Sequence, residues 1–126
     1  MLKALLLVGL GGFAGSVGRY VVHLLIGERW SLIFPWGTFT VNILGCLLIG
    51  LLLGMVGRGA MTMDQTLKLL LVTGFCGGFT TFSAYSMDSI RMLEQGHTIQ
   101  FLIYTIGSVV LGMMATFLGL AVVRGI

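Results

Sequence analysis

The sequence predicts an all-α integral membrane protein with four membrane-spanning helices and a break in the third. Of its 126 residues, 57% are hydrophobic and 9% are charged, whereas soluble domains average about 25% charged residues. The mean hydropathy is +1.08. Four apolar stretches each approach or exceed the roughly 20 residues that cross a bilayer as a helix. At this length we expect one domain, residues 1–126.

The first predicted span covers residues 4–26. It begins after Lys3 and continues past Arg19, and no small-residue cleavage site follows it. We therefore interpret it as a membrane helix and not as a signal peptide.

Two tryptophans mark the connection to the second predicted span, residues 37–56. The connection begins at residues 27–31. Trp30 and Trp36 flank Pro35, as expected for an aromatic belt at a membrane interface. Pro35 fits a loop or the first turn of a helix.

The third predicted span, residues 65–93, is longer than one crossing needs. Thr62 or Asp64 precedes it as a candidate helix cap. Residues 74–86 read GFCGGFTTFSAYS and are rich in glycine and hydroxyl groups but have no charge, and we expect the break near residues 74–83. Membranes tolerate interrupted helices only where the backbone is buried in protein or lines a wet cavity. We therefore predict a helix break and an ion-handling site here.

The fourth predicted span covers residues 99–123. Within the spans, small residues recur four apart, a spacing that lets membrane helices approach closely. The pairs are Gly11 and Gly15, Gly50 and Gly54, Gly74 and Gly78, and Ser108 and Gly112.

Basic residues specify the orientation weakly. Four spans place both termini and the middle loop on one side, which holds four basic residues, and the other side holds Arg29 and Arg91. This bias permits insertion in both directions, and two opposed copies would then form an inverted repeat. The basic residues are scattered, so we expect no nucleic-acid partner.

Polar side chains inside the spans are mainly hydrogen-bond donors. Arg19 has three candidate roles: an attractor for anions, a clamp on carbonyls at the helix break, or a side chain that reaches the interface. Asn42 either bridges helices or lines a path. Tyr104 and Ser108 are one turn apart and share a helix face.

The sequence predicts that no carboxylate joins this polar set, because Asp88 and Glu94 come near the exit of the third span. Donors with one positive charge and no acid suit an anion. The rings of Phe79, Phe82 and Tyr85 add electropositive edges, although packing against lipid or the core explains these rings equally well.

Other chemistry is not indicated. Cys46 and Cys76 have no Cys or His neighbour at metal spacing, so we interpret them as packing residues. His23 and His97 lie near segment ends and are interpreted as interfacial. The sequence has no plausible catalytic triad, phosphate loop or metal cluster, so we predict no enzymatic activity.

Three blocks resemble the Fluc (CrcB-type) fluoride channels, and the likeness covers essentially the whole chain. They are residues 11–20 (GGFAGSVGRY), residues 37–42 (GTFTVN) with Gly45, and the highly specific residues 73–83 (TGFCGGFTTFS). The resemblance implies an antiparallel, dual-topology homodimer in the bacterial cytoplasmic (inner) membrane. It also implies passive, selective export of fluoride from the cytoplasm through two pores built from both subunits.

The resemblance implies roles for individual residues. Backbone carbonyls of Gly77 and Thr80, from both subunits, would hold a structural sodium ion. The fluoride pathway would include Asn42, Phe82, Tyr85, Tyr104 and Ser108, with Thr38, Thr81 and Ser83 as weaker candidates, while Arg19 remains a clamp. The family has Thr-Phe where this chain has Ala84-Tyr85. The Tyr85 hydroxyl therefore either donates a hydrogen bond to fluoride or bonds another group, in which case the ring tilts out of position.

Two other function classes compete with this hypothesis. A small cation-coupled drug exporter also has four spans, but it needs a carboxylate in the first span, where this chain has Arg19. A glycine-rich assembly subunit explains the small residues but not the hydroxyl and aromatic cluster.

Overall fold

The computed structural model describes residues 1–26 and 33–125, and its regular secondary structure in this part of the chain is entirely helical. Four helical stretches here are long and apolar enough to cross a membrane: Leu2–Ile26, Trp36–Gly57, Gln65–Glu94 and Thr98–Arg124. The prediction of four spans is therefore confirmed, and the predicted bounds differ from these by two residues at most. The predicted connection at 27–31, with Arg29 and Trp30, lies outside the described residues.

Three of these stretches are continuous helices, and the third is composite. The continuous ones are α1 (Leu2–Ile26), α2 (Trp36–Gly57) and α6 (Thr98–Arg124). The composite one contains α3 (Gln65–Leu67), the π-helical η2 (Lys68–Cys76), α4 (Gly77–Phe79) and α5 (Phe82–Glu94). Between α4 and α5, Thr80 (φ −83°, ψ 159°) and Thr81 (φ −151°, ψ 117°) have extended backbone.

Side-chain caps begin both halves of this composite stretch. The Asp64 carboxylate accepts a hydrogen bond from the Leu67 N–H at 2.9 Å, so Asp64 is the cap of the two predicted candidates. At the start of α5, the Thr81 hydroxyl accepts from the Ala84 N–H at 3.2 Å. Each cap satisfies an N–H group that has no partner within its own helix.

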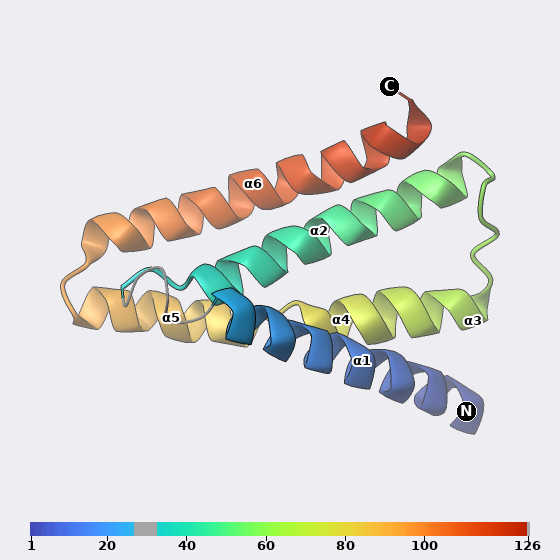
Figure 1. Cartoon of the computed structure of the whole chain (residues 1–126), viewed down its shortest axis with the longest axis horizontal. Coiled ribbons are helices and arrows are strands. Elements are labelled where there is room, and N and C mark those ends of the chain that lie inside the picture. The colour runs from blue at the N-terminus through green and yellow to red at the C-terminus, as the bar shows by residue number, and fades with distance from the viewer. Residues whose placement is uncertain (27–32, 126) are drawn as a thin grey trace.

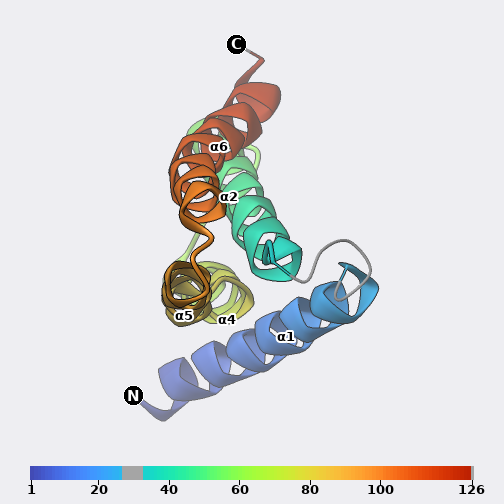
Figure 2. The same ribbon diagram turned by 90° about the vertical axis from the view of Figure 1, so that its left-hand side faces the viewer.

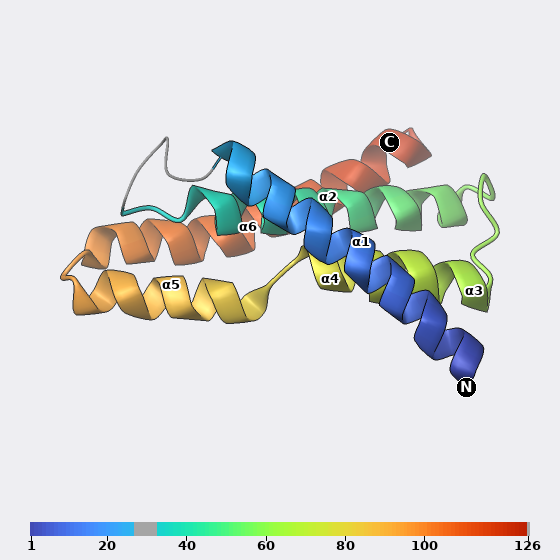
Figure 3. The same ribbon diagram turned by 60° about the horizontal axis from the view of Figure 1, so that its bottom comes forward.

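Both chain termini lie at one end of the bundle, together with the connection from α2 to α3 (Figure 1). The turn from α5 to α6 lies at the opposite end. Seen end-on, the α2–α6 pair lies on one side of α4 and α5, and α1 lies on the other (Figure 2). Helix α1 crosses the composite stretch obliquely at η2 and α4 (Figure 3).

Close backbone approach fixes this crossing. A Cβ atom on Gly11 or Gly15 would collide with a carbonyl oxygen of η2, and one on Gly78 would lie 2.5 Å from the carbonyl oxygen of Gly12. The α2–α6 pair uses the same device, since a Cβ atom on Gly50 would collide with the Thr116 carbonyl oxygen. The prediction that small residues mediate helix packing is therefore confirmed at these crossings.

Candidate functional site

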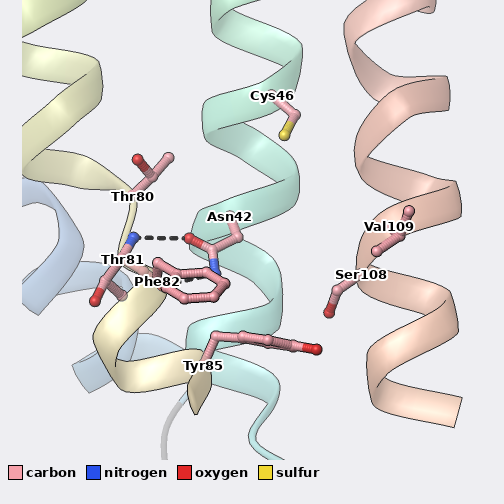
Figure 4. Close-up of a pocket in the computed structure, with 8 residues that line it drawn as sticks. All are labelled: Asn42, Cys46, Thr80, Thr81, Phe82, Tyr85, Ser108 and Val109. Carbon is pink, nitrogen blue, oxygen red and sulfur yellow. Dashed lines mark hydrogen bonds between the residues drawn. The ribbon is translucent and has the colours of Figure 1, made fainter. Parts of the chain in front are cut away.

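An open cavity of about 370 Å³ lies among α2, α5, α6 and the extended threonines (Figure 4). Its lining residues are Asn42, Cys46, Thr80, Thr81, Phe82, Tyr85, Ser108 and Val109. Six of these eight are residues predicted from the sequence to form an ion site. Cys46 and Val109 complete the lining and were not predicted.

Asn42 clamps the extended backbone from α2. Its Nδ2 donates to the Thr81 carbonyl at 3.1 Å, and its Oδ1 accepts from the Thr81 N–H at 2.8 Å. Figure 4 shows the bond from the Thr81 N–H to Asn42 Oδ1 as a dashed line. Asn42 therefore bridges α2 to the start of α5, and it also lines the cavity.

The extended pair deprives two carbonyl groups of their usual helical donors. In a continuous α-helix, the Gly77 carbonyl would accept from the N–H of Thr81, and the Thr80 carbonyl from that of Ala84. Here the Thr81 N–H donates to Asn42, and the Ala84 N–H donates to the Thr81 hydroxyl. The Thr80 N–H and hydroxyl both bond the Cys76 carbonyl. The Gly77 and Thr80 carbonyls are thus among the backbone acceptors at the end of α4 that do not receive their regular helical donors.

One face of α5 is tied to its neighbours at positions 81, 85 and 88. Thr81 is held by Asn42 of α2, and the Tyr85 hydroxyl donates to Thr105 Oγ1 of α6 at 3.1 Å. The side chains of Tyr85 and Asp88 are three residues apart and so share one side of the helix, and the backbone of Thr81 is fixed just before its first turn. The ties therefore fix the rotation of α5 about its axis.

Asp88 makes the third tie and corrects the prediction that no carboxylate joins the polar set. Thr38, which is 3% exposed, donates from Oγ1 to Asp88 Oδ2 at 2.8 Å. The acid lies on the tied face of α5, where it is half-buried, and not at an exposed exit. Thr38 is buried in this contact and does not line the cavity.

Aromatic rings form a ladder beside the cavity. The Tyr85 ring lies between Phe82 and Tyr104, with centroid separations of 5.6 Å and 5.1 Å and tilts of 33° and 34°. Phe82 is 80% exposed in the isolated chain, and Tyr104 is 0% exposed. Phe79 instead stacks on Phe75, away from this ladder.

Two buried hydroxyls, those of Tyr104 and Ser108, make no hydrogen bond of regular geometry among the described residues, and the Thr38 hydroxyl lies near that of Tyr104. They lie one turn apart on α6, as the sequence predicted, and Ser108 lines the cavity. Buried polar atoms in folded proteins are nearly always bonded. These two donors are therefore the groups most in need of an acceptor.

Arg19 and Ser83 lie outside the cavity. Arg19 lines a separate open groove of about 410 Å³ with Ser16, Tyr20, His23, Thr81 and Ala84. It makes no hydrogen bond or ion pair within residues 1–26 and 33–125, so the Thr81 carbonyl is held by Asn42 and not by Arg19. Ser83 lies 3.2 Å from the Thr81 hydroxyl, oxygen to oxygen.

Thr105 and the role of Asp88 were not predicted from the sequence. Thr105 follows Tyr104 directly, so its position beside a predicted site residue was a usable signal. Asp88 follows Tyr85 by three residues, a helical spacing that places both side chains on one face.

Comparison with known proteins extends over nearly the whole chain. The family model described as CrcB-like protein, Camphor Resistance (CrcB), matches residues 6–120. A fluoride-specific ion channel FluC of Phocaeicola vulgatus is 46% identical over 119 residues, which cover 94% of this chain and 97% of that protein. One of Rhizobium meliloti is 47% identical over 120 residues, 95% of each chain. One of Flavobacterium psychrophilum is 42% identical over 123 residues, 98% of each chain.

Proposed function

The chain belongs to the CrcB-like family, and from this premise we propose that it is a fluoride-selective channel that lets fluoride leave the cytoplasm passively. It is a multi-pass membrane protein and a transport protein, not an enzyme. The resemblance found in the sequence is confirmed by the family match and by relatives about 45% identical over the full chain.

The observation that carries the proposal is the pair of buried, unpartnered hydroxyls beside a cavity lined with donors. Leaving a hydroxyl buried without a partner costs about 1–3 kcal/mol. A small anion that accepts hydrogen bonds would relieve this cost at Tyr104 and Ser108. Asn42 contributes as well, because Thr81 uses only one of its two amide N–H groups.

Fluoride is small and strongly hydrated, so a dry apolar passage would exclude it. In our mechanism the Asn42 amide and the hydroxyls of Tyr104 and Ser108 replace part of its water shell in steps. The electropositive edges of the Phe82 and Tyr85 rings cover the remainder. Conduction also requires that each site bind weakly enough for exit.

Asp88 supports rapid exit in this mechanism. Its carboxylate lies on the same face of α5 as Tyr85 and is held by Thr38 at 2.8 Å. A fixed negative charge close to the donor set opposes long residence of an anion. Thr38 therefore acts on the pathway through Asp88, and we assign it no direct contact with fluoride.

We further propose that two copies assemble as an antiparallel, dual-topology homodimer in the bacterial inner membrane. The large apolar side chains exposed on α1 and α6, such as Phe13 at 72% and Phe117 at 63%, suit contact with lipid or a second copy. Both termini and the middle loop share one end of the bundle, where the basic residues only weakly favour one orientation. Each copy would contribute to two pores.

A structural sodium ion fits the chemistry of the extended pair, which we interpret as a helix break within the membrane. Gly77 and Thr80 offer carbonyl oxygens without their usual helical donors, and oxygen ligands suit a hard cation. Gly77 is exposed in the isolated chain, so a second copy can share the site and complete four ligands. Bound sodium would neutralise these carbonyl dipoles and stabilise the extended backbone.

The deciding experiment is anion efflux from liposomes that contain the purified protein. We expect passive fluoride efflux that needs no proton gradient, with chloride efflux far slower under the same gradient. Proton-coupled uptake of a cationic drug would identify an exporter instead, and the absence of all transport would support an assembly subunit. Either result would refute the proposal.

A further inference from the structure

We propose that Arg58 and Arg124 form a binding site for the phosphate group of an anionic phospholipid, at the end of the bundle that carries both chain termini. Arg58 follows α2 directly, and Arg124 is the last residue of α6. This site would bind a membrane lipid and not the transported ion, so it does not depend on the proposed function.

The two arginines meet in the seam between the last turns of α2 and α6, residues 54–58 and 121–124. The two helices run side by side and finish at the same end of the bundle (Figure 1). Arg58 Nη1 donates to the Val123 carbonyl at 2.7 Å. Arg124 extends the opposite way, since a Cβ atom on Gly57 would lie 2.6 Å from its Nη2. Each arginine therefore reaches the last turn of the other helix.

Most of the guanidinium N–H groups in the seam make no hydrogen bond within residues 1–26 and 33–125. A guanidinium has five N–H donors, of which Arg58 uses one and Arg124 uses none. Capping of carbonyls does not explain the position of Arg124. At the end of α2, the carbonyls of Gly54, Met55 and Val56 already accept from backbone N–H groups. Both arginines thus have donors for a further acceptor.

The positive charge of the seam exceeds what the protein around it compensates. In the part of the chain that the structure describes, neither guanidinium pairs with a carboxylate. Asp64, the acid closest to Arg58 in sequence, accepts instead from the Leu67 N–H at the start of α3. The C-terminal ends of two helices supply roughly −0.5 charge each, about half of what two arginines carry. An anion between the guanidinium groups would neutralise the remainder and relieve their repulsion.

The surroundings of the seam favour a lipid phosphate over a phosphate in solution. Helices α2 and α6 are both long and apolar enough to cross the membrane, so their ends lie at the level of the lipid headgroups. The turns that lead to the arginines expose large apolar side chains: Leu53, Val56, Leu118 and Val122. Acyl chains can cover these side chains while the headgroup binds the arginines.

The chemistry of arginine selects an anionic headgroup. Its planar guanidinium binds two phosphate oxygens at once and keeps its charge when it is partly removed from water. Phosphatidylglycerol presents a phosphate without a cation, whereas the choline group of phosphatidylcholine would bring a positive charge close to both arginines. We therefore expect the seam to prefer phosphatidylglycerol.

The test titrates each phospholipid into the purified protein in a neutral detergent and follows the melting temperature, which rises with the concentration of a ligand that binds the folded state. Phosphatidylglycerol should bind more tightly than phosphatidylcholine with the same acyl chains. Arg124→Gln should weaken phosphatidylglycerol binding about fivefold, the contribution of one basic residue at an anionic membrane surface. It should leave phosphatidylcholine binding unchanged. Arg58→Gln should weaken phosphatidylglycerol binding by at least the same factor.

Arg91→Gln is the matched control. Arg91 is exposed in the last turn of α5, toward the opposite end of the bundle, so this variant removes the same charge away from the seam. Its affinity for phosphatidylglycerol should stay within about twofold of the original value. All three variants should elute from gel filtration with the original protein, which separates lost lipid binding from lost folding.

Inorganic phosphate distinguishes a lipid site from a site for a soluble anion. It should leave the melting temperature of the original protein unchanged, because it has no acyl chains. If it stabilises the original protein but not Arg124→Gln, the seam binds a soluble anion and its assignment to a lipid is wrong. Equal affinity for the two phospholipids would overturn the proposal as well, and so would equal losses in Arg91→Gln and Arg124→Gln.

Discussion

Asn42 and Thr81 form a two-point pair in which one side-chain amide satisfies both backbone groups of an extended residue, at 3.1 Å and 2.8 Å. They are 39 positions apart in the chain. The pair joins α2 to the start of α5, and it diverts the Thr81 N–H from the Gly77 carbonyl. One amide therefore stabilises the extended backbone and leaves that carbonyl available to a ligand.

Asn42→Ala should destabilise the protein by about 2 kcal/mol or more, because it leaves both polar backbone groups of Thr81 without partners. Asn42→Asp keeps the oxygen that accepts from the Thr81 N–H but loses the donor to the Thr81 carbonyl, so we expect a smaller loss. Thermal unfolding in detergent measures both. If the Asn42→Ala protein has the same melting temperature as the original protein, the pair contributes nothing to stability.

Gly11→Ala should weaken the crossing of α1 over η2. The added Cβ would collide with the Leu70 carbonyl oxygen, and overpacking of this kind costs about 1–3 kcal/mol. Gly9→Ala is the control, since nothing lies within 4 Å of a Cβ there. It should leave stability unchanged or raise it, by at most about 1 kcal/mol from helix propensity. Equal melting temperatures for the two variants would contradict close packing at Gly11.

Removal of sodium should lower the melting temperature if the Gly77 and Thr80 carbonyls hold the ion. The measurement exchanges sodium for a bulky organic cation, N-methyl-D-glucamine, at constant ionic strength, and then restores sodium. Ligands that bind only the folded state stabilise it by mass action, so the melting temperature should rise with sodium concentration and saturate. A melting temperature indifferent to the cation would exclude a structural sodium ion.

The spans and the glycine contacts were predictable from sequence because hydropathy and four-residue spacing are local signals. The Asp64 cap is local as well, because its carboxylate accepts a hydrogen bond from an N–H group only three residues later. The contacts of Asn42, Asp88 and Tyr85 were not predictable, because each depends on how far one helix is rotated and shifted against another. The π-helical η2 also escaped prediction, since its apolar sequence is equally compatible with an α-helix.

Variants that lack the hydroxyl of Tyr104 or Ser108 should separate an effect on fluoride transport from an effect on stability. Both are buried without a partner, so removing either one should not destabilise the fluoride-free protein. Tyr104→Phe and Ser108→Ala should melt at or above the original temperature, because an unsatisfied buried hydroxyl costs about 1–3 kcal/mol. If these groups are donors to the anion, each variant should also lose about tenfold in fluoride efflux and lose stabilisation by fluoride.

Tyr20→Phe is the control, since Tyr20 is 64% exposed on α1 and contributes to neither the cavity nor its ring ladder. It should change neither the efflux nor the melting temperature. Full fluoride efflux in both Tyr104→Phe and Ser108→Ala would remove these hydroxyls from the pathway. A drop in their melting temperature without fluoride would instead mean that the assembled protein supplies a partner, which in the homodimer that we propose would come from the second copy. An unchanged or higher melting temperature therefore indicates a hydroxyl that donates to the ion, whereas a lower melting temperature indicates a hydroxyl that stabilises the fold.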